Sequence, residues 1–395
     1  MAAPRHTIRI DWRRWCGFPC VGLLFAAALA GFANAQPRAQ EPAPEPRYFR
    51  IGTAATGGSF FEIGGIVASA VSGPTEGPPC GRGGTCGVPG LVAVAQATPG
   101  SIGNLRLIDK GEIESGFAQA DLAGWAYNGV KLFADSGPLR ELRAIASLFP
   151  AVAHLVVRAD SPIRSLADLK GKTVAVGEAG SGSAADAAIV FEAAGLGGGD
   201  LVQRYLRPAP GAAELKAGTI DALFLVGGSP VPVIRDLAAS TPIRLIPIEG
   251  EVVERLKKDF AHYQITAIPA GAYSGVETPT PSIGFSALWL TNSRADPDLV
   301  YAITKSLWNP ATAKLLSAVE PIGAQIRLER ALDGLSVPLH AGAARFYREA
   351  GLPVNNTPAL PPETQANGNG TKEVAQDGRG KDISSEADAV QPKEP

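Results

Sequence analysis

Two glycine- and serine-rich loops carry the residues of this sequence that are best suited to binding chemistry. The first spans residues 57–59 and the second spans residues 180–183. Each follows an apolar, strand-like stretch and precedes a helical pattern. Glycine lets the backbone approach a ligand closely, serine can cap the following helix, and a helix N-terminus attracts anions through its free N–H groups and its dipole. The loops therefore predict two lobes that meet only across one anionic ligand, with one helix N-terminus from each lobe pointing at it.

The segments around these loops alternate between strand-like and helix-like patterns, which is typical of α/β proteins with parallel sheets. Strands are predicted at 48–53, 113–119, 173–177, 202–206, 220–226 and 282–291. Helices are predicted at 60–71, 101–110, 121–129, 183–194, 212–217, 297–307, 311–319 and 341–350. Residues 142–157 are apolar, contain Pro150 and are too long for one ordinary strand, so they are interpreted as a crossing between lobes. The expected fold is α/β, with two mostly parallel sheets flanked by helices and a ligand cleft between the lobes.

The two ends of the chain differ in composition from its middle. Residues 1–35 combine a basic stretch, the apolar run 21–32 and Ala33-Asn34-Ala35, and predict a signal peptide cleaved after Ala35. Residues 36–46 form a proline-rich spacer, and residues 353–395 are polar and predicted to be disordered. The ordered body divides into lobe I at 47–150, lobe II at 151–278 and a return to lobe I at 279–352. The protein is therefore expected to be exported to the periplasm, and both the Sec and the twin-arginine routes stay open.

The charge and the cysteines restrict the class of protein further. A formal net charge of −2 does not suit nucleic-acid binding, which needs a basic surface. Cys80 and Cys86 are the cysteines that remain after cleavage, and in an oxidising compartment they predict a disulfide around a short loop. The zinc alternative lacks a second pair of ligands nearby. No cofactor is expected.

Several motifs occur in one order along residues 47–352. They are Ile51-Gly52-Thr53 with the loop at 57–61, residues 87–91, Gly100-Ser101 with Asn104, residues 117–121, residues 165–172, residues 180–182, Asp221-Ala222 with Gly227-Gly228, and residues 338–343. In these motifs the chain resembles the TAXI family, the extracytoplasmic solute receptors of one class of TRAP transporter. The resemblance implies a two-lobe periplasmic binding-protein fold of type II, which closes on a small solute such as an organic acid or an amino acid. It also implies delivery of that solute, expected to be a carboxylate, to membrane subunits driven by an ion gradient.

The resemblance also implies a set of ligand-binding residues. They are Thr53, Gly58, Ser59, Phe60, Asn104, Gln119, Asp121, Gly180, Ser181, Gly182, Ser183 and Gly228. Many relatives have tyrosine where this chain has Phe60 and Phe61, so a phenolic hydroxyl is absent here. Other TRAP receptors clamp a carboxylate with arginine, and Arg143 and Arg158, which flank the proposed crossing, are interpreted instead as surface or hinge residues.

An enzyme and a solute sensor are the alternatives to a transport receptor, because the same bilobal fold supports all three. The histidines outside the signal peptide, His154, His262 and His340, fit no catalytic motif, and nucleophile-elbow, zinc-protease and phosphate-loop patterns are absent from the sequence. Asp121 and Asp221 could form an acid–base pair only if the fold brought them together. The sequence therefore favours a binding protein without enzymatic activity.

Overall fold

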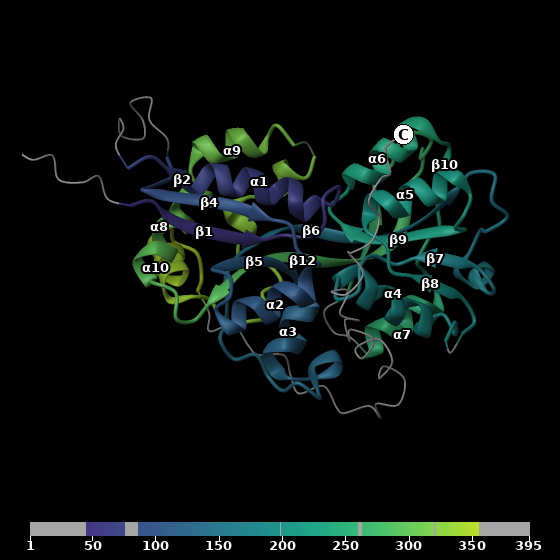
Figure 1. The fold of residues 1–395 in the computed structure, drawn as a ribbon, viewed down its shortest axis with the longest axis horizontal. Coiled ribbons are helices and arrows are strands. Elements are labelled where there is room, and N and C mark those ends of the chain that lie inside the picture. Colours follow the sequence, from purple (N-terminus) through teal and green to yellow (C-terminus); the bar gives the residue numbers. More distant parts are fainter. Residues whose placement is uncertain (1–44, 76–85, 198, 260–262, 320, 355–395) are drawn as a thin grey trace, which may run out of the picture. The chain divides into compact units, whose positions relative to one another are not determined.

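The computed structural model describes residues 45–75, 86–197, 199–259, 263–319 and 321–354 (Figure 1). The predicted signal peptide, Cys80, His262 and residues 355–395 lie outside these ranges. Within them the chain forms one ten-stranded mixed sheet, flanked by helices, and a separate two-stranded pair. The expected α/β class is confirmed.

Two sets of parallel strands make up the two ends of this sheet. The first strand set contains β4 (Leu91–Gln96), β1 (Arg47–Gly52) and β5 (Ser115–Gln119). The second strand set contains β9 (Ala222–Gly227), β7 (Thr173–Ala175) and β8 (Val202–Arg204). These sets correspond to the two parallel sheets expected from the sequence, and the structure joins them into one hydrogen-bonded sheet.

Two long antiparallel strands, β6 (Leu142–Arg158) and β12 (Thr280–Asn292), make that junction. β12 pairs with β5 on one side and with β6 on the other, and β6 continues past this ladder to pair with β9. The expectation that residues 142–157 are too long for one strand was therefore wrong. The strand stays continuous because β12 supports it up to Val152, where the pairing with β9 begins, and Pro150 lies opposite Ser286 before that point.

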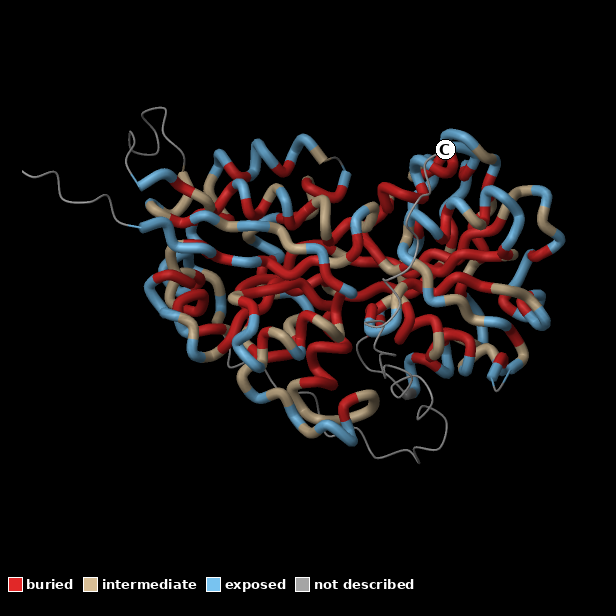
Figure 2. Tube along the Cα trace, viewed as in Figure 1, coloured by how far each residue is buried: buried red, intermediate tan, exposed pale blue. Residues whose placement is uncertain are grey.

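Helices cover both faces of the sheet (Figure 1). On the face of α2 and α3, one buried cluster runs beneath both strand sets, whereas two separate clusters cover the other face. The described helices are α1 (Ser59–Val71), α2 (Ser101–Lys110), α3 (Ala120–Asn128), α4 (Gly182–Ala193), α5 (Pro208–Ala217), α6 (Pro232–Ser240), α7 (Glu251–Asp259), α8 (Pro297–Leu307), α9 (Pro310–Leu316) and α10 (Ala341–Glu349). Figure 2 shows that the buried residues concentrate on the sheet and on the helix faces that contact it.

The smaller elements complete the ends of the sheet. β10 (Ile243–Leu245) pairs with β6 and β11 (Gln264–Ile268) with β12, while β2 (Ser72–Gly73) and β3 (Val88–Pro89) form the separate pair. Val354 packs against the buried cluster beneath the first strand set, so packing continues slightly beyond the predicted start of the tail at 353. No helix in the described ranges is both long enough and apolar enough to cross a membrane.

Candidate functional site

A small cavity lies where the two glycine–serine loops meet. It leaves about 60 Å³ of free space, enough for a few water molecules. Its walls come from five parts of the chain: residues 54, 55 and 58–60, residues 99–101, Gln119 at the end of β5, residues 177, 178 and 181–183 with Pro208, and residues 225, 226 and 231. The N-termini of α1 and α4 thus reach one cavity, as the two loops predicted.

The first loop presents a helix N-terminus without a side-chain cap. Gly58 is the N-cap of α1, in an extended conformation, and Ser59 is the first residue of the helix. The Ser59 hydroxyl does not cap the helix, because it donates to the backbone oxygen of Gly228 at 3.1 Å. Phe60 stands edge-to-face against Phe117 and Phe149, which fixes its ring in the cavity wall.

In the second loop, unlike the first, one serine caps the following helix and another hydrogen-bonds to a neighbouring strand. Ser181 is the N-cap of α4, and its Oγ accepts from the backbone N–H of Ala184 at 3.1 Å. The Ser183 Oγ accepts from the N–H of Val226 at 2.9 Å. Since both hydroxyl oxygens act as acceptors in these bonds, each O–H remains able to donate to a ligand. Gly180, with φ of +80°, permits the tight turn before Ser181.

Gln119 closes the cavity from the side of the first strand set. Its Nε2 donates to Asp186 Oδ2 on α4 at 2.6 Å, and its Oε1 accepts from the Ser101 hydroxyl at 3.3 Å. Gly182 packs directly against this amide, because a Cβ at position 182 would stand 1.7 Å from Gln119 Oε1. Only glycine fits here without moving Gln119.

The two sides of the cavity touch each other without a ligand. Besides the Gln119–Asp186 and Ser59–Gly228 bonds, the N–H of Val233 donates to the oxygen of Gly57 at 3.1 Å. The expectation that the lobes meet only across a ligand was therefore wrong. Direct polar contacts hold this arrangement closed.

Some residues implied by the family resemblance lie behind the cavity instead of in its wall. Asn104 is fully buried, and its Nδ2 donates to the backbone oxygens of Gly52, Thr53 and Phe117, which ties α2 to β1 and β5. Thr53 donates to the oxygen of Gln96. Gly180, Gly228 and Asp121 also lie outside the lining, while Gly58, Ser59, Phe60, Gln119, Ser181, Gly182 and Ser183 belong to it.

Asp121 and Asp186 form a buried carboxyl pair behind Gln119. Asp121 is in the first turn of α3 and Asp186 is in α4, and both are almost wholly excluded from solvent. Burial raises the pKa of Asp121 to about 7. Burial, together with the negative charge of Asp121, raises the pKa of Asp186 well above its usual range.

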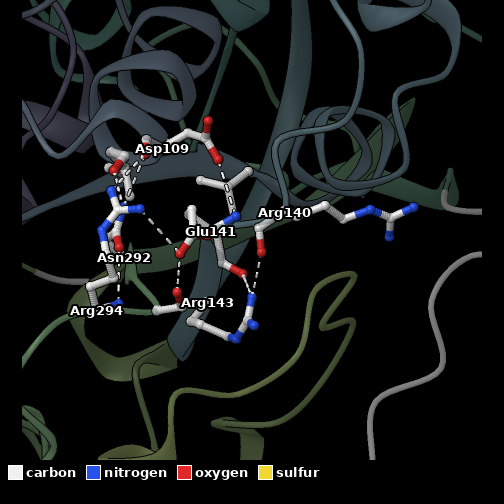
Figure 3. Close-up of polar contacts among 9 residues, drawn as sticks. Asp109, Arg140, Glu141, Arg143, Asn292 and Arg294 are labelled. Carbon is white, nitrogen blue, oxygen red and sulfur yellow. Dashed lines mark hydrogen bonds and ion pairs between the residues drawn. The ribbon is translucent and has the colours of Figure 1, made fainter.

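Glu178 is the charged side chain in the cavity wall, and its carboxylate pairs with Arg207 at 2.6 Å. The arginines considered from the sequence lie elsewhere. Arg143 donates to the backbone oxygens of Arg140 and Leu142, in the polar cluster at the start of β6 shown in Figure 3. Arg158 pairs with Asp160. Anion binding at the cavity would therefore depend on backbone N–H groups and hydroxyls.

Comparison with known proteins identifies the family. A model of the NMT1-like family matches residues 51–351, which is most of the chain. The chain belongs to the NMT1-like family. Among solved structures it is similar to the alkanesulfonate-binding protein SsuA from Xanthomonas axonopodis pv. citri bound to MOPS, at 19% identity over 79% of this chain and 82% of that one, with a TM-score of 0.42. It is also similar to the aliphatic sulphonate binding protein SsuA from Escherichia coli, at 17% identity over 79% and 96%, with a TM-score of 0.37.

The described histidines of this NMT1-like protein have structural roles. His154 Nδ1 donates to the oxygen of Val152, and its Nε2 accepts from the Tyr273 hydroxyl, which in turn accepts from the N–H of Val231 in the cavity wall. Burial lowers the pKa of His154 to about 4, so the ring is neutral at physiological pH. His340 caps α10 by accepting from the N–H of Gly342.

The structure does not bring together Asp121 and Asp221, the acid–base pair considered from the sequence. Asp221 accepts from the N–H of Thr173 and faces Lys172, so it is not paired with Asp121. The described residues contain no group of three or more histidine, cysteine and acidic side chains that could hold a metal ion.

Several residues of the cavity wall were not among those implied by the family resemblance. Ser101 follows a Pro-Gly turn, Glu178 lies two residues before the second glycine–serine loop, and Pro208 begins α5. Ser101 and Pro208 lie at helix starts and Glu178 lies just before one, so the general rule that ligands meet helix N-termini could have found them. Leu225 and Val231 carry no such signal, because apolar residues at a strand end look the same whether they pack in a core or line a cavity.

Proposed function

We propose that this NMT1-like protein is an extracytoplasmic solute-binding receptor that captures a small carboxylate by closing around it. The observation that carries the proposal is the convergence of α1 and α4 on one cavity. The loop before α1 and the loop before α4 come from different strand sets, and neither N-terminus has its backbone donors wholly capped by side chains. Such paired N-termini suit an anion.

The polar groups of the cavity support a small anionic or zwitterionic ligand. The O–H groups of Ser181 and Ser183 are left to donate, and the Glu178 charge is already balanced by Arg207. Gln119 offers its Oε1, an acceptor, to the same space. This combination fits an organic acid or an amino acid better than a bulky or cationic solute.

Entry of such a ligand requires the cavity to open, because about 60 Å³ is less than an amino acid needs. β6 and β12 are the strands that join the two strand sets: β12 pairs with β5 and with β6, and β6 continues to pair with β9. The ladder between β6 and β12 has two register irregularities, after Ala287 and after Trp289. We place the hinge in these strands. Lobe I then comprises residues 47–150 and 279–352, and lobe II comprises residues 151–278.

The resemblance to TAXI receptors favours delivery to the membrane subunits of a TRAP transporter in the periplasm, after cleavage at Ala35. Uptake of the solute should then depend on an ion gradient and should continue when ATP hydrolysis is blocked. Uptake that requires ATP hydrolysis would instead assign the protein to a different transporter class. Chemical turnover of the bound solute would make it an enzyme, and binding without uptake would make it a sensor.

A thermal-shift screen of small organic acids and amino acids should identify the ligand. The protein for this screen lacks residues 1–35 and is first unfolded and refolded to remove any bound solute. For a solute that raises the melting temperature, calorimetry should show weaker binding by Ser183→Ala and Ser181→Ala. Loss of a hydrogen bond to a charged group should reduce affinity roughly tenfold to a hundredfold. Ser136→Ala, at an exposed serine outside the cavity, is the control and should bind normally. Equal affinity in all three variants would contradict the assigned site.

A further inference from the structure

The buried pair of Asp121 and Asp186 joins elements that belong to different strand sets. α3, which contains Asp121, packs against β5 and β12, whereas α4, which contains Asp186, packs against β9 and α7. Both helices lie on the same face of the sheet and contribute to the same buried cluster (Figure 1). A movement that separates the strand sets must therefore also separate the two carboxyl groups.

The hydrogen bonding of the pair is incomplete if both groups are ionised. Asp186 Oδ2 accepts from Gln119. Asp186 Oδ1 and both oxygens of Asp121 have no donor in good hydrogen-bonding geometry, although the backbone N–H groups of Asp121 and Leu122 interact with the Asp121 carboxyl group and favour its ionised form. The two carboxyl groups interact with each other, because this interaction lowers the pKa of Asp121 and raises that of Asp186. Two carboxylates cannot bond to each other, whereas one carboxyl and one carboxylate can share a proton.

Among the described residues, no positively charged side chain is placed to neutralise the carboxyl pair instead of that proton. The charged groups on the surrounding elements lie at the surface or are paired: Glu114 with Arg50 before β5, Glu178 with Arg207 before α4, and Arg255 with Glu251 on α7. Arg106, Asp109 and Lys110 on α2 and Glu192 on α4 are exposed or half-exposed. The side chains that interact with the pair are therefore Gln119 and the two carboxyl groups themselves, beside the backbone N–H groups of Asp121 and Leu122.

We propose that Asp121 and Asp186 share one proton and that this bond latches the binding cleft in its closed form. The inference rests on the proposed function, since it describes how the closure of that same cleft is regulated. Closing takes up a proton from solvent, and opening exposes both carboxyl groups to water and releases it. The latch also orients Gln119, because the proton lets Asp186 remain an acceptor for Nε2 while it bonds to Asp121.

The direction in which pH shifts the equilibrium between the open and closed forms follows from the proton taken up on closing. In the open form both groups should ionise near the ordinary carboxyl pKa, while the closed form keeps its proton to higher pH. Above that ordinary pKa, the ratio of closed to open protein should fall about tenfold for each pH unit, for as long as the closed form holds the proton. Acid should close the cleft and alkali should open it, without any ligand.

Asparagine substitutions test the latch because an amide supplies the donor without a proton. In Asp186→Asn the amide oxygen can accept from Gln119 and the amide N–H can donate to Asp121. Small-angle scattering of the ligand-free protein between about pH 5 and about pH 8 should show wild type expanding as pH rises, while Asp186→Asn expands less, because the amide N–H stabilises the ionised Asp121. Infrared spectra should show a protonated-carboxyl band in the wild type near neutral pH that is weaker in Asp186→Asn. Asp121→Asn is the second variant and should behave in the same way.

Asp135→Asn, at an exposed acid, is the matched control and should keep the wild-type pH response. A wild-type protein whose dimensions do not change with pH, or that lacks the infrared band, would overturn the latch even if no variant folds. An unchanged pH response in Asp186→Asn would also overturn it, as would loss of the response in Asp135→Asn. Because these measurements use no solute, their failure leaves the receptor function standing. A ligand screen without hits would weaken the receptor function but not the latch.

Discussion

Gly182→Ala tests whether the contact between Gly182 and Gln119 belongs to the ligand-bound form. An alanine Cβ would stand 1.7 Å from Gln119 Oε1, 2.7 Å from its Cδ and 2.8 Å from Ser101 Oγ. Gln119 cannot simply swing away, because its amide bonds to Asp186 on one side and to Ser101 on the other. The substitution should therefore oppose closure while leaving each strand set able to fold.

The size of the effect follows from the bonds that the clash breaks. Losing the bond between Gln119 and the Asp186 carboxyl group, and the neutral bond to Ser101, should disfavour the closed form by about 2–4 kcal/mol. If the ligand binds only the closed form, its affinity should fall roughly thirtyfold to several hundredfold. Thermal stability should change little, because replacing glycine by alanine in a helix contributes up to about 1 kcal/mol in the opposite direction.

Gly65→Ala is the matched control for this substitution. Gly65 is also a helical glycine, in α1, and a Cβ there would meet nothing within 4 Å. This variant should bind like wild type and be slightly more stable. Calorimetry with a solute from the screen, and scattering with and without that solute, would measure affinity and closure in all three proteins. Normal affinity in Gly182→Ala would refute the reasoning, because Gln119 would then be free to move at no cost to binding.

Three other predictions concern stability. Tyr273→Phe should leave His154 Nε2 and the N–H of Val231 without partners and lower the free energy of unfolding by about 1–3 kcal/mol, seen as a lower melting temperature. His154 has a folded-state pKa of about 4 against 6.5 when unfolded, so its contribution to stability is complete above pH 6.5 and is lost as pH falls towards 4. That loss should amount to roughly 3 kcal/mol, and urea unfolding across this range should show a shallower acid slope for His154→Gln. Cys80 and Cys86 should be bonded in the exported protein and contribute about 2 kcal/mol, so labelling of the unfolded, unreduced protein should find no free thiol.

The regular elements of this protein could be predicted where local sequence signals were strong. The helix at 101–110 was predicted with its observed bounds because Gly100 and Gly111 mark its ends, and the helix at 297–307 begins at a proline that follows an aspartate cap. α5 begins four residues earlier than expected, because Pro208 is the first residue of the helix and was treated as part of the loop.

The length of β6 could not be predicted, since it depends on tertiary pairing. Residues 142–157 exceed an ordinary strand, and Pro150 suggests a break. What keeps this segment extended is its pairing with β12 and β9, which are distant in the sequence. Local patterns contain no information about those partners, so a continuous strand could not be distinguished from two short ones.

The sequence indicated that the two loops meet, but not which single residues line the cavity between them. Gln119 and Asp121 are two positions apart, yet Gln119 lines the cavity and Asp121 is buried behind it. The chain changes from strand to helix between them, so the direction of each side chain depends on the exact start of α3. Asn104 illustrates the same limit, because a buried amide that holds three backbone oxygens and a ligand-binding amide are identical in sequence.

The direct contacts across the cavity change how affinity should be understood in this protein. If the two strand sets met only through the ligand, all of the free energy that favours closure would have to come from contacts with the ligand. Here the Ser59–Gly228 and Gln119–Asp186 bonds favour closure by themselves, which raises the closed fraction of free protein and with it the apparent affinity. The same contacts oppose release, because an occupied cleft must break them before the solute can leave. A receptor that has to deliver its solute therefore needs a way to weaken these bonds at the membrane, and the buried carboxyl pair beside Gln119 lies where loss of one proton would do so.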